Sequence, residues 1–147
     1  RLASLPSRCR LILASQSPRR REILDMMGLA NGYEVIVSSF DEETLRDYKH
    51  TVPPEEYVVH SASCKAASVA ATLERDENGR RTLVVGSDTT VAVDGTVLDK
   101  PEDEDEARRM LRRLSGRTHE VHTGVALYGS SNAYAAPLSS FAVSTRV

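Results

Sequence analysis

The sequence has few of the features on which several classes of protein depend. Its two cysteines, Cys9 and Cys64, are too few for a disulfide framework and lack the spacing of metal ligands. It has no run of about 18 apolar residues, the length that a membrane-spanning helix needs. The first ten residues carry charge without the apolar stretch of a secretory signal. We therefore expect a reducing, cytoplasmic setting and no membrane partner.

Charge and aromatic content argue against a nucleic-acid-binding domain. The net charge is −2, and only 5% of the residues are aromatic. Such a domain needs a broad basic face and, for single strands, aromatic side chains between the basic ones. Only three of the 19 basic residues are lysines, namely Lys49, Lys65 and Lys100. We therefore expect no nucleic-acid partner, and the scarce lysines become candidates for specific roles.

The chain also lacks several common catalytic signatures. It contains no Gly-x-Ser-x-Gly nucleophile motif, no P-loop and no glycine fingerprint for dinucleotides. Its 147 residues suffice for one domain with a real core, and a hydrophobic fraction of 40% is typical of a folded protein. The function must therefore be sought in other motifs of a single globular domain.

Helix signals alternate with strand signals in the first half, and strands dominate the second half. We expect strands at residues 10–14, 34–38, 82–87, 89–93, 96–98, 119–128 and 138–147. Helices are expected to begin at Pro18, at Pro53-Pro54 (ending near residue 74) and after Pro101. Asp94-Gly95 predicts a two-residue hairpin turn. The pattern predicts a mixed α/β fold with a curved, partly antiparallel sheet and flanking helices.

Three consecutive arginines in the first turn of a predicted helix are the most informative feature. Ser17 suits the N-cap and Pro18 the first helical position, so residues 19–21 form that first turn. A helix N-terminus carries partial positive charge and unpaired N–H donors, so carboxylates are usual there. Arginines there cost stability unless an anion such as phosphate binds them. The alternative is that they are ordinary surface charges.

Another predicted helix of the same chain obeys the usual rule. Acidic residues 102–106 precede apolar positions at 107, 110, 111 and 114, which have helical spacing. A solvated helix start, favourably placed in the helix dipole, explains this acidic run without any ligand. The arginine turn therefore stands out by comparison.

Carboxylates follow two of the predicted strands. Asp88 comes directly after a buried apolar strand, where α/β proteins place their sites. It could hold Mg²⁺, deprotonate a water, or serve only as an Asx-type turn residue. Asp41, Glu42 and Glu43 follow another strand and could supply a second carboxylate or form an ordinary acidic loop.

The lysines and histidines leave their roles open. Lys65 lies in a predicted helix near its apolar face, where its ammonium either extends to solvent or reaches into a site. Lys100 precedes Pro101 at a strand end and is uninformative alone. His119 and His122 have an odd spacing, which places them on opposite faces of a strand, so we expect no shared metal site.

Taken together, these segments resemble the Maf family in order and spacing. The motifs are Leu13-Ala14-Ser15-Gln16-Ser17-Pro18-Arg19-Arg20, Asp41-Glu42, Lys65-Ala66, Gly86-Ser87-Asp88-Thr89, Leu98-Asp99-Lys100-Pro101 and Ser115-Gly116-Arg117-Thr118-His119. The resemblance implies an inosine triphosphatase-like fold with a cleft between two lobes. It divides the chain into an N-terminal extension, residues 1–10, and a Maf-like nucleotide pyrophosphatase domain, residues 11–147, which lacks the family's C-terminal segment.

The resemblance also implies an activity. Maf proteins hydrolyse nucleoside triphosphates to monophosphate and pyrophosphate in a metal-dependent reaction. This reaction removes noncanonical or surplus nucleotides from the nucleotide pool. Thr89 and Ser17-Pro18-Arg19-Arg20 look like the branch that acts on dTTP, UTP and modified pyrimidine nucleotides. The family was named for septum formation, so the alternative is a non-catalytic nucleotide-binding regulator of cell division. Family members are often dimers, which implies a homodimer here.

Residue roles follow from the same resemblance. The family's phosphate-binding residues match Ser15, Arg19 and Arg20. Its acidic and basic cleft residues match Glu42, Lys65, Asp88 and Lys100. Asp88 stands at the position of the catalytic base or metal-linked acid, and Asp88 with Glu42 would hold Mg²⁺ or Mn²⁺.

Overall fold

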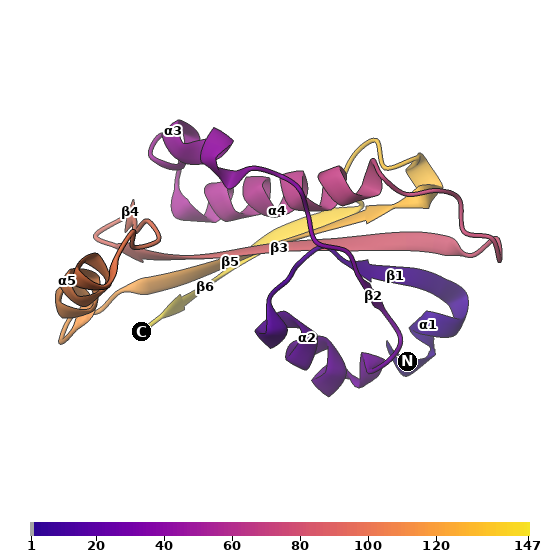
Figure 1. Cartoon of the computed structure of the whole chain (residues 1–147), viewed down its shortest axis with the longest axis horizontal. Coiled ribbons are helices and arrows are strands. Elements are labelled where there is room, and N and C mark those ends of the chain that lie inside the picture. The colour runs from indigo at the N-terminus through magenta and orange to yellow at the C-terminus, as the bar shows by residue number, and fades with distance from the viewer. Residues whose placement is uncertain (1) are drawn as a thin grey trace.

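The computed structural model describes residues 2–147 and contains a six-stranded mixed sheet between two groups of helices (Figure 1). The strands are β1 (Cys9–Leu13), β2 (Glu34–Val35), β3 (Arg81–Val93), β4 (Thr96–Val97), β5 (Glu120–Gly129) and β6 (Ser139–Arg146). Their order is β2-β1-β3-β5-β6, with β4 paired to β3. β2 and β3 run parallel to β1, whereas the β3–β4, β3–β5 and β5–β6 pairs are antiparallel. The predicted mixed α/β fold class is confirmed.

The helices lie on both faces of this sheet. They are η1 (Leu2–Ser4), α1 (Leu5–Arg8), α2 (Pro18–Leu24), the π-helix η2 (Asp25–Leu29), η3 (Glu42–Leu45), α3 (Arg46–Lys49), α4 (Pro54–Ala70), α5 (Glu104–Leu114) and η4 (Ser130–Asn132). Figure 1 shows α3 and α4 over one face, α1 and α2 over the other, and α5 beside β4 at one end. None of the helices in residues 2–147 is long and apolar enough to cross a membrane.

The core lies between α4 and the central strands. Its main cluster consists of Ile12, Ala14, Ala62, Ala66, Val69, Ala70, Val84, Ala126 and Tyr128. Two glycines of the strands let α4 lie directly on the sheet backbone. A Cβ on Gly124 of β5 would lie 2.3 Å from the carbonyl carbon and oxygen of Val58, a distance that real Cβ atoms do not reach. The absence of a side chain at Gly124, and likewise at Gly86 of β3, therefore allows α4 to lie close to the sheet.

Strand β3 is one continuous element where the sequence predicts two. The break expected near Asp88 does not occur, because Asp88 pairs with Gly124 of β5 and stays in the ladder. The Asx-turn interpretation of Asp88 is therefore wrong. The Asp94-Gly95 turn that follows joins β3 to β4 as predicted, with φ of 51° and 76° at its two residues.

Three other elements differ from the sequence prediction. The acidic segment that begins at Asp41 folds into η3 and α3, because the Asp41 carboxylate accepts the Glu43 N–H at 3.0 Å and starts a helical turn. Strand β2 has only two residues, and α4 ends at Ala70 rather than near residue 74. The helix predicted after Pro101 does form as α5, none of whose residues is fully buried, and Leu111 is 67% exposed.

The predicted domain limits stay predictions. The proposed N-terminal extension begins at Arg1, which lies outside the described residues, and its remainder forms η1, α1 and the first part of β1. The two lobes and their cleft also stay predictions. β6 is an edge strand whose Phe141 and Val143 side chains are more than half exposed.

Candidate active site

The centre of the site is a buried ammonium between two carboxylates. Lys65 Nζ lies 2.8 Å from Asp88 Oδ1 and 2.8 Å from Glu42 Oε1. Lys65 and Asp88 are each more than nine-tenths buried. The three residues come from α4, β3 and η3, so the tertiary fold, not local sequence, assembles the group.

Helix–sheet packing explains why Lys65 points inward. Gly86 and Asp88 are two residues apart on β3 and therefore face the same side of the sheet, toward α4. Lys65 follows Ala62 by about one helical turn, on the buried stripe of α4. Ala62 and Ala66 both lie over Gly86, so Lys65 also lies above this part of β3, and its long side chain reaches Asp88. The interpretation in which Lys65 extends to solvent is wrong.

Glu42 links this buried pair to the surface. Its Oε2 lies 3.2 Å from Lys100 Nζ, and the Lys100 side chain is 88% exposed. Burial alone raises the pKa of Glu42, but the hydrogen bond and charge of Lys65, with the charge of Lys100, outweigh it and hold that pKa below its ordinary value. Glu42 is therefore an anion at neutral pH between two cations.

Arg20 is placed on the opposite face of β3. Its Nη1 donates to Ser15 Oγ at 3.0 Å, and its Nη2 donates to Thr89 Oγ1 at 3.4 Å. Burial lowers the pKa of Arg20, while the negative charges of Asp88 and Glu42 raise it, so the guanidinium lies within the field of both carboxylates. It stays protonated at physiological pH. Asp88 and its neighbour Thr89 thus join the two halves of the site across β3.

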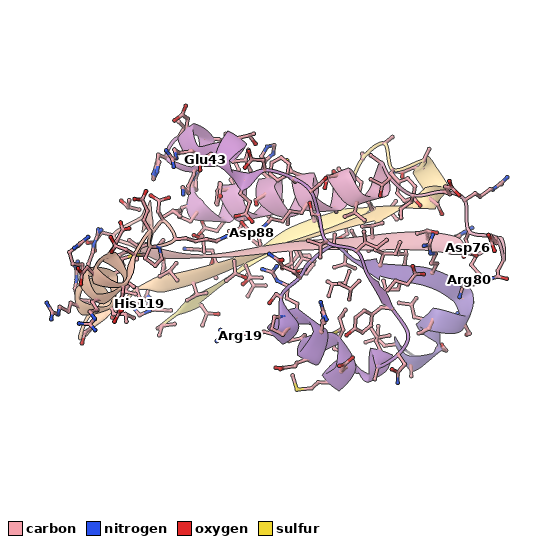
Figure 2. All side chains as sticks on the ribbon, viewed as in Figure 1. Arg19, Glu43, Asp76, Arg80, Asp88 and His119 are labelled. Atoms are coloured by element: carbon pink, nitrogen blue, oxygen red, sulfur yellow. The ribbon has the colours of Figure 1, made fainter. Side chains whose placement is uncertain are left out.

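Arg19 is the predicted site residue that the structure does not bring into this group. Its side chain is exposed and has no hydrogen bond or ion pair within residues 2–147. Figure 2 shows Arg19 at the start of α2, apart from Asp88. Ser17 occupies the N-cap position, but its side chain makes no capping bond; its N–H donates to Ser15 Oγ at 3.2 Å instead. The other six predicted residues lie together: Ser15, Arg20, Glu42, Lys65, Asp88 and Lys100.

Two residues of α4 belong to the same surroundings, and sequence reasoning missed them. Tyr57, Ser61 and Lys65 are four residues apart and share one stripe of the helix. Counting back from Lys65 in steps of four could therefore have identified both residues from the sequence. Burial, followed by the negative charges of Asp88 and Glu42, raises the pKa of Tyr57 to about 12, so its hydroxyl is neutral. Ser61 Oγ is fully buried and has no hydrogen-bond partner in the described part of the chain.

The carboxylates fit a hard divalent cation that arrives with phosphate. Mg²⁺ is usually bound through one or two carboxylates together with oxygens of substrate phosphates. Asp88 and Glu42 supply two such carboxylates beside the basic groups that would hold the phosphates. No group of three or more His, Cys, Asp or Glu side chains in residues 2–147 could hold a metal by itself. The donor set therefore fits a metal–nucleotide complex better than a resident ion.

A cavity of about 460 Å³ lies elsewhere, at the far end of β3. Its lining includes Asp76 and Arg80, which form an ion pair, and none of the predicted site residues. Figure 2 shows Asp76 and Arg80 at the opposite end of the molecule from Glu43. The candidate site therefore lies apart from this cavity.

Comparisons with known proteins agree on one family. The family model described as "Maf-like protein" matches residues 10–147. A dTTP/UTP pyrophosphatase of Akkermansia muciniphila is 48% identical over 117 residues, which are 80% of this chain and 56% of that protein. The dTTP/UTP pyrophosphatase of Acetivibrio thermocellus is 45% identical over 119 residues, again 80% of this chain and 56% of that protein. The chain thus spans about half the length of these curated relatives.

A human relative and a solved structure complete the comparison. A probable bifunctional dTTP/UTP pyrophosphatase/methyltransferase protein of Homo sapiens is 44% identical over 123 residues, 84% of this chain and 19% of that protein. A HAM1 protein from Coxiella burnetii has a TM-score of 0.49 at 18% identity, covering 94% of this chain and 71% of that chain. Because the family model covers nearly the whole chain, this protein belongs to the Maf-like protein family.

Proposed function

We propose that this chain carries the triphosphate-binding half of a nucleoside triphosphate pyrophosphatase site. The reaction is hydrolysis between the α- and β-phosphates of dTTP, UTP or modified pyrimidine nucleotides, which yields a nucleoside monophosphate and pyrophosphate. Relatives at 43–48% identity that bear the name dTTP/UTP pyrophosphatase support the substrate class. The observation that carries the proposal is the buried Lys65 bridge between Asp88 and Glu42, next to Arg20.

Basic side chains of the site bind the triphosphate. The Arg20 guanidinium has five N–H donors and uses two on Ser15 and Thr89, which leaves others for phosphate oxygens. Lys100, whose side chain is exposed beside Glu42, binds them from the solvent side. Arg19 lies one residue before Arg20 and turns toward the phosphates when a nucleotide binds. Charge neutralisation of this kind is the main source of catalysis in phosphoryl transfer.

Asp88 accepts a proton from the attacking water. Lys65 holds Asp88 Oδ1 at 2.8 Å, and Oδ2 of the same carboxylate makes no hydrogen bond or ion pair within the described residues. The water loses its proton to Oδ2 as its oxygen bonds to the α-phosphorus, and pyrophosphate leaves. Asp88 and Glu42 would hold Mg²⁺ or Mn²⁺, which would supply charge neutralisation and a lower pKa for the attacking water.

A non-catalytic nucleotide-binding regulator is the second candidate, and one observation favours it. Lys65 occupies both carboxylates at once, so the site can bind an anion through its basic groups without recruiting a cation. The enzyme interpretation requires instead that Glu42 and Asp88 give up part of their contact with Lys65, so that their oxygens can bind the metal of an arriving metal–nucleotide complex. A role in septum formation, the cytoplasmic setting and the homodimer stay predictions.

One experiment separates the two candidates. Pyrophosphate and phosphate release are measured from a panel of nucleoside triphosphates with Mg²⁺ or Mn²⁺, together with equilibrium binding of the same nucleotides. The variants are Asp88→Asn and, as a control, Asp94→Asn in the exposed turn that follows β3. Pyrophosphate release that Asp88→Asn abolishes, with binding retained in both variants, supports the enzyme. Binding without release in every form supports the regulator, and no binding by the unmodified chain contradicts both.

A further inference from the structure

Arg20 is anchored at two points that belong to different parts of the sheet. Ser15 follows the end of β1, and Thr89 lies in β3, so the guanidinium spans the gap between these strands. The contact with Ser15 is 3.0 Å, whereas that with Thr89 is 3.4 Å, at the long end of a hydrogen bond. The direction of the guanidinium therefore depends on where the Thr89 hydroxyl is held.

Thr89 is itself paired with a residue of the next strand. Its Oγ1 lies 3.1 Å from Thr123 Oγ1, and the two residues face each other directly in the β3–β5 register. The carbonyls of Val85 and Val91 bond away from β5, to Ala14 N–H and Leu98 N–H, so the backbone of Thr89 faces that side too. Thr89 and Thr123 therefore form a non-hydrogen-bonded pair, the kind in which side chains of neighbouring strands approach most closely.

The Thr89 hydroxyl can make its contacts with Arg20 and with Thr123 at the same time. A threonine hydroxyl has one proton and two lone pairs. Thr89 Oγ1 accepts an N–H from Arg20 with one lone pair, which leaves its proton and its second lone pair for Thr123. Both threonines are β-branched and therefore stiff at χ1, so a contact between their hydroxyls fixes each rotamer with little entropic cost.

We propose that Thr123 is a positioning residue of the triphosphate site. It holds the Thr89 hydroxyl, and through it the Arg20 guanidinium, at the geometry that meets the phosphates. The proposal rests on the proposed function, because it assigns Thr123 to the same site. Thr123 lies on β5 and makes no hydrogen bond with Arg20 in the described part of the chain, so its effect on binding passes through Thr89.

The test uses variants that remove or keep only the hydroxyl. Thr123→Val deletes it, Thr123→Ser restores it, and Thr145→Val makes the same change on β6 at a threonine without such a partner in the described residues. Each is made in the unmodified chain and in Thr89→Val. The readouts are the dissociation constant for dTTP, KM and kcat for pyrophosphate release, and the thermal midpoint.

We expect Thr123→Val to raise the dissociation constant and KM about threefold to tenfold, the size of one hydrogen bond. The change in kcat should be smaller. Thr123→Ser and Thr145→Val should bind dTTP like the unmodified chain. Across the variants, the thermal midpoint should not change in parallel with the dissociation constant. In Thr89→Val the same Thr123→Val change should have no further effect. Undiminished binding in Thr123→Val, or an equal effect in the Thr89→Val background, overturns the proposal while leaving the proposed function intact. If the unmodified chain binds no nucleoside triphosphate, the proposed function fails and the assignment of Thr123 falls with it.

Discussion

Gly86 of β3 lies directly beneath the carbonyl oxygen of Ala62 in α4, so close that a Cβ on Gly86 would be 2.1 Å from that oxygen. A Cβ there would also lie 2.8 Å from the Ala66 Cβ and 2.9 Å from the Ala66 N. Asp88 follows Gly86 on the same face of β3, and Lys65 lies between Ala62 and Ala66 on the helix. The absence of a side chain at Gly86 therefore sets the separation at which Lys65 reaches Asp88.

Gly86→Ala should disturb both stability and the site. The new methyl group meets the backbone of α4, which cannot move alone, so we expect a loss of about 1–3 kcal/mol or more in the free energy of unfolding. Gly129→Ala is the matched control on β5, because its Cβ would meet the flexible end of Leu138 at 2.4 Å. Urea unfolding and dTTP binding check both variants. A cost for Gly86→Ala no larger than that for Gly129→Ala contradicts the packing argument.

The two lysines of the site should differ sharply when each is replaced by methionine. Lys65→Met leaves the buried Asp88 carboxylate without its partner, and an unpaired buried charge costs about 3–5 kcal/mol. Lys100→Met removes an exposed ion pair with Glu42, which contributes about 0–1 kcal/mol. Chemical unfolding at neutral pH should therefore distinguish them, although both should weaken dTTP binding. Equal stability of the two variants would show that Lys65 is not held as described.

Glu42 makes stability depend on acidity in a defined direction. Its pKa in the folded chain lies below the ordinary value of 4.5, so the charged Glu42 stabilises the fold. This stabilisation is complete above pH 4.5 and is lost as the pH falls through the pKa of Glu42 in the folded chain. Unfolding of the unmodified chain and of Glu42→Gln should differ most above about pH 5 and converge in acid. Most of this convergence should vanish in a Lys65→Met background, because the Lys65 contact is the largest cause that lowers the pKa. A difference that is constant with pH would contradict the assignment.

Charge reversal should separate the inner arginine of α2 from its exposed neighbour. Arg20→Glu removes the guanidinium between Ser15 and Thr89 and adds an anion beside Asp88, so the dissociation constant for dTTP should rise about 100-fold or more. Arg21→Glu makes the same change in net charge at an exposed position and should have only a small effect. Calorimetric titration at two salt concentrations measures both. Similar losses in the two variants would mean that net charge, not the position of Arg20, governs binding.

Residue patterns predicted the elements that obey local rules. Apolar runs marked β1, β3 and β5, and proline with helical spacing marked the starts of α2 and α4. Local capping also works in α5, where the Asp103 carboxylate accepts the Glu106 N–H at 2.7 Å. The break predicted within β3 was wrong because a strand residue that pairs across the sheet can carry a carboxylate toward a buried cation.

The assembly of the site depends on long-range contacts that no local pattern contains. Glu42 and Asp88 are 46 positions apart in the chain, and only the packing of η3 and α4 over β3 brings both to Lys65. The Thr89–Thr123 contact depends on the register of β3 and β5, which spacing along the chain does not supply. The sequence left open whether Arg19 binds phosphate or is a surface charge, and the tertiary structure exposes Arg19 while Arg20 turns toward Ser15.

The most direct test of the central claim is the product balance of dTTP turnover by the unmodified chain and by Asp88→Asn. Both proteins are first shown to bind dTTP, and dTMP, dTDP, pyrophosphate and phosphate are then quantified with Mg²⁺ or Mn²⁺ present. The account predicts equal amounts of dTMP and pyrophosphate from the unmodified chain and none from Asp88→Asn. Formation of dTDP and phosphate, or equal turnover by the two proteins, would contradict it.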